Sequence, residues 1–155
     1  MVPDGSSGAT EGGEGIPNID SVKSTIRTYY GATNAGISNK VSSPYISELA
    51  GIEADNQDRL VNQCQREVRK GGSPAIVFDA DDTTLWTYDM EDNAMHFNFD
   101  PVLQDTQWVQ PMRFPATPGM VDLVNAVGDA GCTVVGLTGR RVPQRAATLG
   151  NLALV

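Results

Sequence analysis

The sequence predicts an α/β domain in which a parallel sheet carries helices on both faces. Two short apolar runs, 75–78 and 133–137, are rich in β-branched residues and end directly before polar residues, as buried parallel strands do. Segments with helical spacing lie before, between and after these runs. The order strand, connection, helix, strand, helix is typical of a right-handed parallel α/β sheet.

Composition and charge restrict the kind of protein. The chain has 155 residues, 40% of them hydrophobic and 19% charged, which fits one globular domain with a core. A formal charge of -8 and a pI near 4.4 argue against binding of nucleic acid or of an anionic membrane surface. The sequence shows neither an apolar stretch of about 20 residues, as a membrane span needs, nor a signal peptide. Because the net charge is negative, a phosphate-bearing ligand would need a local attraction such as a metal ion.

The N-terminal part predicts a tail followed by two helices. Residues 1–15 are Gly, Ser and acidic residues, so we expect a flexible tail, with the domain occupying 16–155. One helical pattern begins at Ile19, with Asn18 or Asp20 as N-cap, and should end near Gly31. A longer pattern begins at Ser43-Pro44 and stops at Lys70-Gly71, with Gly51 as a point where it could break.

The two predicted strands flank a long connection. Residues 86–115 are aromatic-rich without a clear period, and we interpret them as an excursion over the sheet edge. Thr117 followed by Pro118 predicts a helix start, with the end at Gly131, and a last helix is expected over 143–154. The inner face of the first of these helices should carry Met120, Leu123, Val124 and Val127. For Cys64 and Cys132 we favour two buried thiols over a disulfide.

An acidic cluster follows the first predicted strand, where open α/β sheets bind their ligands. In extended chain Asp79 and Asp81 point to the same side, with Ala80 turned toward the core. One carboxylate can attack phosphorus, the other can protonate the leaving oxygen, and Mg²⁺ can neutralise the charge. The alternative is a solvated turn or a helix cap. A calcium loop is excluded because Met90 stands where the closing glutamate should be.

The second strand ends in a complementary feature. The hydroxyl of Thr138 and the backbone N–H groups that follow, beginning at Gly139, can cradle a phosphate oxygen at the start of a helix. A hydroxyl that only caps the helix is the alternative.

Residues 76–85 (IVFDADDTTL) and 134–140 (VVGLTGR) together resemble the first and second signature motifs of the haloacid dehalogenase (HAD) superfamily. The similarity is greatest to its bacterial acid phosphatases of class B and class C type, and it extends from about Ile16 to the C-terminus. It implies an HAD-like Rossmannoid sheet with N-terminal helices and a small cap insertion over about 86–115.

The resemblance also implies roles for individual residues. Asp79 would be the nucleophile that becomes aspartyl-phosphate, and Asp81 the general acid and base whose carbonyl contacts Mg²⁺, so both count as metal-site residues. Thr138, Gly139 and Arg140 would bind the phosphate of a small ester. In the cap, Trp86, Tyr88, His96 and Phe97 are candidates for substrate contact, although packing is the favoured role of the aromatic residues and an ordinary loop position that of His96.

The sequence departs from the family after the second motif. The family's phosphate-binding lysine or arginine and its later acidic pair have no counterpart, and Arg141 and Arg145 are the only cations that could substitute. The interpretation is a C-terminally truncated domain with an exposed sheet edge that could support self-association. The leading function is a Mg²⁺-dependent acid phosphatase, and the alternative is an inactive fragment that binds phosphate or a partner. The family is commonly exported, which leaves the location undecided for a chain without a signal peptide.

Overall fold

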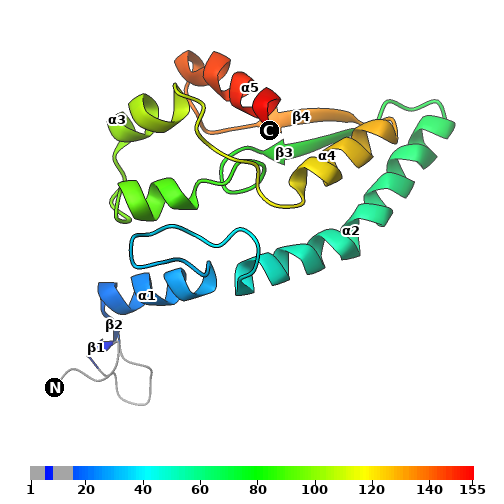
Figure 1. The fold of residues 1–155 in the computed structure, drawn as a ribbon. Helices are drawn as coiled ribbons and strands as arrows, with labels where there is room; N and C mark the ends of the chain where they lie inside the picture. Colours follow the sequence, from blue (N-terminus) through cyan, green and yellow to red (C-terminus); the bar gives the residue numbers. More distant parts are fainter. Residues whose placement is uncertain (1–5, 9–15) are drawn as a thin grey trace.

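A computed structural model describes residues 6–8 and 16–155 (Figure 1). Most of the predicted tail, 1–15, lies outside the described residues; the described part of it is β1 (Ser6–Gly8), which pairs antiparallel with β2 (Ile16–Pro17) at the start of the predicted domain. The remaining elements are α1 (Ile19–Tyr29), α2 (Pro44–Arg69), β3 (Ala75–Asp79), η1 (Met90–Ala94), α3 (Pro101–Leu103), η2 (Gln104–Val109), α4 (Met120–Asp129), β4 (Thr133–Leu137), η3 (Val142–Gln144) and α5 (Arg145–Leu154). Nothing in the described part of the chain is a helix long and apolar enough to cross a membrane.

The two N-terminal helices begin at capping side chains. Asn18 Oδ1 accepts from the Ser21 N–H at 2.9 Å, and Ser43 Oγ accepts from the Ile46 N–H at 3.2 Å ahead of the N1 proline of α2. Both starts agree with the sequence prediction. The predicted break at Gly51 does not occur, because α2 continues through it.

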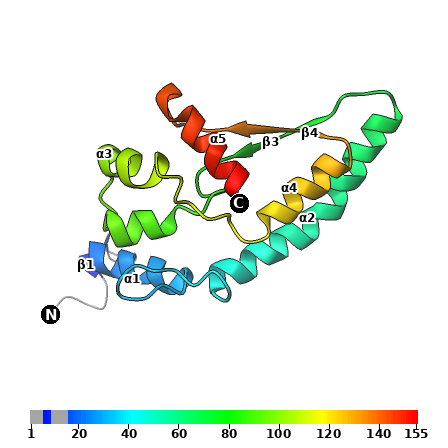
Figure 2. The ribbon, with the colours of Figure 1, turned by 45° about the horizontal axis from the view of Figure 1, so that its top comes forward.

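The sheet consists of β3 and β4, which pair in parallel with Ala75 opposite Thr133 and Asp79 opposite Leu137. Helix α4 connects the two strands, as predicted. Helices α2 and α4 pack together, and α4 contacts the sheet (Figure 2). The core of this layer consists of Cys64, Met120, Leu123, Val127 and Cys132, with Ile76 and Phe78 from β3 packed against it.

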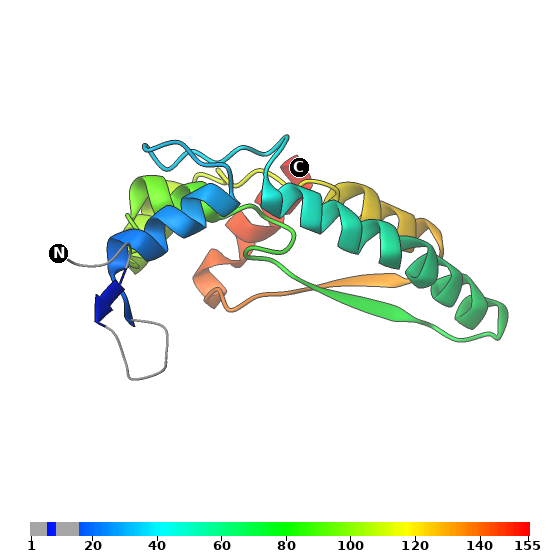
Figure 3. The same ribbon diagram turned by 90° about the horizontal axis from the view of Figure 1, so that it is seen from below.

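The other face of the sheet differs from the prediction of helices on both faces. Figure 3 shows the strands at the margin of the molecule, with α2 and α4 on one side only. Alternate residues of the strands therefore point away from the helices, and Val77, Val135 and Leu137 are 58%, 42% and 62% exposed. Their apolar sequence was interpreted as burial on both sides, but within residues 18–155 no helix packs on this face.

Helix α4 begins later than the sequence predicts. Thr117 is not its N-cap, because Leu85 and Ala116 form an antiparallel bridge and the Thr117 N–H donates to the Thr84 carbonyl at 3.0 Å. These contacts keep the chain extended past Thr117. The helix starts after Gly119, whose φ of 83° reverses the chain.

The 86–115 segment is more helical than its irregular sequence pattern predicts. It contains η1, α3 and η2, and its apolar side chains form a second core with Leu85 and with α5. The buried members are Leu85, Met90, Met95, Val109, Phe114 and Ala147. This core fixes the segment and α5 next to the carboxyl ends of the strands (Figure 1).

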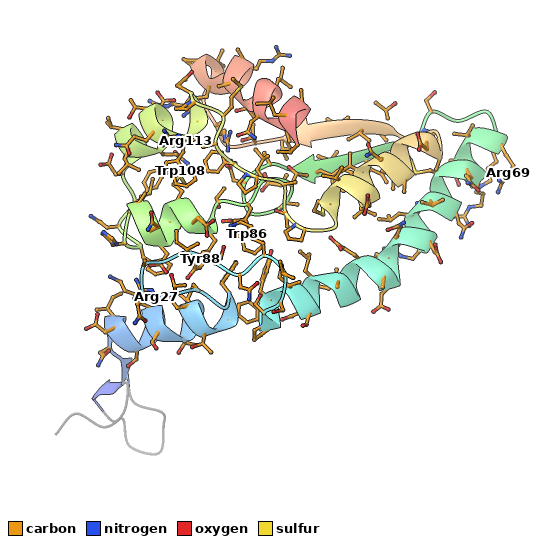
Figure 4. The ribbon with its side chains drawn as sticks, in the orientation of Figure 1. Arg27, Arg69, Trp86, Tyr88, Trp108 and Arg113 are labelled. Carbon is orange, nitrogen blue, oxygen red and sulfur yellow. A yellow bond between two sulfur atoms is a disulfide. The ribbon has the colours of Figure 1, made fainter. Side chains whose placement is uncertain are left out.

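The N-terminal helices brace this segment. Arg27 in α1 donates to both oxygens of Asp92, from Nε at 2.8 Å and from Nη2 at 2.6 Å, and Tyr88 donates to the same carboxylate at 2.8 Å. Figure 4 shows Arg27 extending toward Tyr88 between the two parts of the chain. Trp86 is 2% exposed and donates from Nε1 to Ser38 Oγ at 2.9 Å. Trp86 and Tyr88 are therefore packing residues, the role favoured for them above.

The cysteine prediction is wrong. Cys64 and Cys132 form a disulfide across a sequence separation of 68 residues. The last turns of α2 pack against the turn that precedes β4, which brings the two Cα atoms to 5.3 Å, a spacing at which a disulfide forms without backbone movement. The separation in sequence gave no indication of this proximity.

Candidate active site

The acidic cluster lies where β3 ends and the chain turns away. The ladder with β4 extends one residue beyond the strand, since the Ala80 N–H donates to the Leu137 carbonyl at 3.0 Å. Ala80 is buried at 3% exposure, as predicted. Asp82 then takes a left-handed φ of 56°, a conformation that Asp and Asn tolerate best among non-glycine residues. Its carboxylate accepts a hydrogen bond from the Thr87 hydroxyl, which stabilises the turn.

Asp79 presents an exposed carboxylate at this turn. Its carbonyl accepts from the Thr84 hydroxyl at 3.0 Å, which fixes the backbone. Its side chain forms no hydrogen bond or ion pair with any residue in the described ranges. Asp79 lies opposite Leu137 in the ladder, so it ends its strand beside the residue that precedes Thr138. An exposed, unpaired carboxylate at this position is accessible to a ligand.

Asp81 and Thr138 come together as the strand-end argument predicts. The Thr138 hydroxyl donates to Asp81 Oδ2 at 3.3 Å and accepts from the Arg140 backbone N–H at 3.1 Å. The guanidinium of Arg140 also binds Asp81: Nη2 lies 2.6 Å and Nε 3.0 Å from Oδ1. The Arg140 side chain is 3% exposed and that of Asp81 31%. Asp81, Thr138 and Arg140 thus form one hydrogen-bonded unit, and the Asp79 side chain is not hydrogen-bonded to it.

A cleft of about 430 Å³ opens at this unit. Asp81, Gly139 and Arg141 line it from the strand ends, and Phe99 and Gln104 line it from the cap segment, together with Pro101, Arg140 and Gln144. None of the four cap residues singled out from the sequence contributes to this lining. Phe99, which is 62% exposed and was not among those four candidates, is an aromatic residue of this segment that does line the cleft.

Sequence reasoning missed further titratable groups that lie near Asp82. Burial, and then the carboxylates of Asp82 and Asp81, raise the pKa of Glu91. Burial, followed by Tyr45 and Asp82, raises the pKa of Tyr30 to about 12. Glu91 lies in the segment without a clear period, and Tyr30 more than 40 residues before the motif, so no local pattern indicated their proximity.

Mg²⁺ can be tested against these donors. The exposed Asp79 carboxylate and the Asp81 carbonyl are hard oxygen ligands at one turn, which fits a hard divalent cation. Across residues 6–8 and 16–155, no group of three His, Cys, Asp or Glu side chains is arranged to hold a metal. These residues therefore fit part of a magnesium shell, with water or other donors completing it.

A parallel α/β sheet with an Asp-x-Asp turn beside a strand-end Thr-Gly is the arrangement that the two sequence motifs predict. The family model described as HAD superfamily, subfamily IIIB (acid phosphatase) matches residues 31–154. The chain therefore belongs to this family, which confirms the resemblance identified from its two motifs.

Solved structures provide a further comparison. The class C acid phosphatase from Bacillus anthracis matches with 25% identity, a TM-score of 0.49 and coverage of 64% of this chain. The same enzyme with tungstate bound matches with 24% identity, a TM-score of 0.49 and the same 64% coverage of this chain. The chain spans 44% and 46% of the lengths of these two structures, which is less than half. No curated protein matches the sequence.

Proposed function

We propose that this chain carries the catalytic turn of a Mg²⁺-dependent acid phosphatase that hydrolyses small phosphate monoesters through an aspartyl-phosphate at Asp79. The observation that carries the proposal is the hydrogen-bonded pair Asp81 and Thr138 at the strand ends, with the exposed residue Asp79 two positions before Asp81. Membership of the acid phosphatase family supports the same reaction.

The reaction uses the two carboxyl groups in sequence. A carboxylate oxygen of Asp79 attacks phosphorus, the bond from phosphorus to the ester oxygen breaks, and the protonated Asp81 gives its proton to the leaving alkoxide. Asp81 then accepts a proton from water as the water oxygen attacks the phosphorus of aspartyl-phosphate. Inorganic phosphate leaves and the Asp79 carboxylate is regenerated.

Thr138 and Gly139 would hold the phosphoryl oxygens. The Thr138 hydroxyl donates to Asp81 in the structure, so it must rotate its single proton toward the ligand when phosphate binds. The N–H of Arg140 fixes the oxygen of that hydroxyl at 3.1 Å and limits its movement. Bound Mg²⁺, held by Asp79 and the Asp81 carbonyl, would offset the repulsion between these carboxylates and an anionic substrate.

Hydrolysis of p-nitrophenyl phosphate at about pH 5 to 7 tests the proposal, with and without Mg²⁺. We expect turnover that needs Mg²⁺ and is lost in the Asp79→Asn variant. Asp20→Asn is the matched control, since it removes an exposed carboxylate of α1 away from the turn. Equal rates for wild type and Asp79→Asn would reject Asp79 as nucleophile.

A second candidate function is binding without turnover. The exposed apolar face of β3 and β4 favours it, because such a surface invites association with another chain or with itself. Under this alternative the folded chain binds inorganic phosphate or self-associates, yet wild type is as inactive as Asp79→Asn. Light scattering combined with phosphate titration distinguishes this behaviour from turnover.

A further inference from the structure

We infer that the guanidinium of Arg140 is a positioning group for Asp81 and not a ligand of the substrate phosphate. The sequence alone places this arginine with the phosphate-binding residues, after Thr138 and Gly139. The inference rests on the proposed role of Asp81 as the proton donor and acceptor of the reaction.

The hydrogen bonds of the guanidinium are the first part of the argument. Nε lies 3.0 Å from Oδ1 and 3.2 Å from Oδ2 of Asp81, and Nη2 lies 2.6 Å from Oδ1. This two-point contact fixes the plane of the carboxylate as well as its position. A lysine, which provides a point charge, could hold the position but not the plane.

The surroundings of the guanidinium are the second part. Nη1 donates to Thr148 Oγ1 at 3.1 Å, and Thr148 donates in turn to the Gln144 carbonyl at 2.9 Å. The face of the guanidinium lies over the Phe114 ring, with Cζ 4.8 Å from the ring centroid. Asn151 holds the backbone of Phe114 on both sides, accepting from its N–H at 3.0 Å and donating to its carbonyl at 2.6 Å.

Access is the third part. The Arg140 side chain is 3% exposed, so a phosphate that enters from solvent meets little of the guanidinium. Arg141, the neighbour of Arg140, is exposed and also lines the cleft, so its side chain is accessible to an anionic substrate. Both arginines contribute to the lining of the cleft, but the guanidinium of Arg140 is buried and bound to Asp81, whereas Arg141 is exposed.

The test compares Arg140→Gln with the matched variant Arg141→Gln by two readouts. The first is the ¹³Cγ resonance of Asp81 in protein labelled at aspartate, identified by its loss in Asp81→Asn. The second is a steady-state analysis with p-nitrophenyl phosphate, with inorganic phosphate as inhibitor. We expect Arg140→Gln to shift the Asp81 resonance and to lower kcat by about tenfold or more, with KM and the phosphate inhibition constant changed by less than about twofold. Arg141→Gln should leave the resonance in place and weaken phosphate inhibition.

The inference is overturned if the Asp81 resonance is unchanged in Arg140→Gln, or if that variant weakens phosphate inhibition at an unchanged kcat. Should Arg140→Gln fail to fold, Arg140→Lys replaces it, because the lysine retains the charge and lacks the fork. The same shift and the same fall in kcat are expected. If wild type shows no turnover that depends on Asp79, the proposed function fails, and the resonance comparison alone still decides whether Arg140 positions Asp81.

Discussion

Reduction of the disulfide between Cys64 and Cys132 should destabilise the domain strongly. The bond joins the C-terminal part of α2 to the turn before β4, and both cysteines are buried, at 1% and 8% exposure. They pack with Val127 and Leu123 in the core between α2 and α4. Loss of the bond releases the helix from the sheet at the end of the molecule away from the acidic turn (Figure 1).

The size of the effect follows from the length of the closed loop. A separation of 68 residues gives an entropic stabilisation of about 4 kcal/mol in the loop-closure treatment of disulfides. In a chain of 155 residues, each 1 kcal/mol corresponds to about 2 to 4 °C in Tm. Reduction should therefore lower Tm by about 8 to 16 °C.

Thermal unfolding followed by circular dichroism, with and without dithiothreitol, measures the effect. A Cys64→Ala/Cys132→Ala variant is the control, since it should unfold near the Tm of the reduced wild type and show no response to reductant. Thiol titration of the denatured, unreduced protein should find no reactive sulfhydryl at either position. Two reactive thiols, or a Tm unchanged by reductant, would show that the cysteines do not pair and that the loop argument does not apply.

Three further predictions concern other parts of the chain. The Arg27 hydrogen bonds lower the pKa of Asp92, so the ionised Asp92 stabilises the fold above about pH 4 and this contribution is lost as pH falls below it. The difference in unfolding free energy between wild type and Asp92→Asn should therefore shrink from about pH 6 to about pH 3, and a constant difference would contradict this. Gly36→Ala should destabilise the fold by about 1 to 3 kcal/mol, because its φ is +76° and a Cβ would lie 2.7 Å from the Asn93 backbone nitrogen. Gly51→Ala, in an open part of α2, should instead stabilise it by about 0.5 to 1 kcal/mol, and urea unfolding in which the two changes have the same sign would refute this reasoning. Phe99→Ala should change the free energy of unfolding by less than about 0.5 kcal/mol because the side chain is largely exposed, yet it should raise KM for p-nitrophenyl phosphate because Phe99 lines the cleft. An unchanged KM would show that Phe99 does not contact the substrate.

Much of the fold could be predicted because its signals are local. The N-cap at Ser43 with Pro44 behind it, and the apolar runs that became β3 and β4, each specify structure within a few residues. The start of α4 was misplaced because a tertiary contact, the bridge between Leu85 and Ala116, overrides a local capping signal. The 86–115 segment was interpreted as irregular for a related reason, since its helical turns are stabilised by a core shared with α5 and not by a periodic face of its own.

The candidate site shows the same division. Asp79, Asp81 and Thr138 could be chosen as candidates because each lies at the end of a strand, and strand ends are visible in the sequence. Phe99 could not be distinguished from Phe97, because both are aromatic residues of one aperiodic segment. Only the turn after Met95, where His96 and Phe97 both have positive φ, determines which ring reaches the cleft.

The contacts that complete the site connect residues far apart in the chain. Arg140 meets Asp81 across 59 positions, Phe114 meets Asn151 across 37, and Arg27 meets Asp92 across 65. Taken alone in the sequence, each of these residues can be interpreted without a partner, for example as a solvated arginine beside a helix start or as a polar residue within a helix. Burial strengthens such a contact, because water competes little for a guanidinium at 3% exposure that binds a carboxylate. Helix α5, through Thr148 and Asn151, therefore holds in place the arginine that binds Asp81 and the backbone of the phenylalanine beneath it.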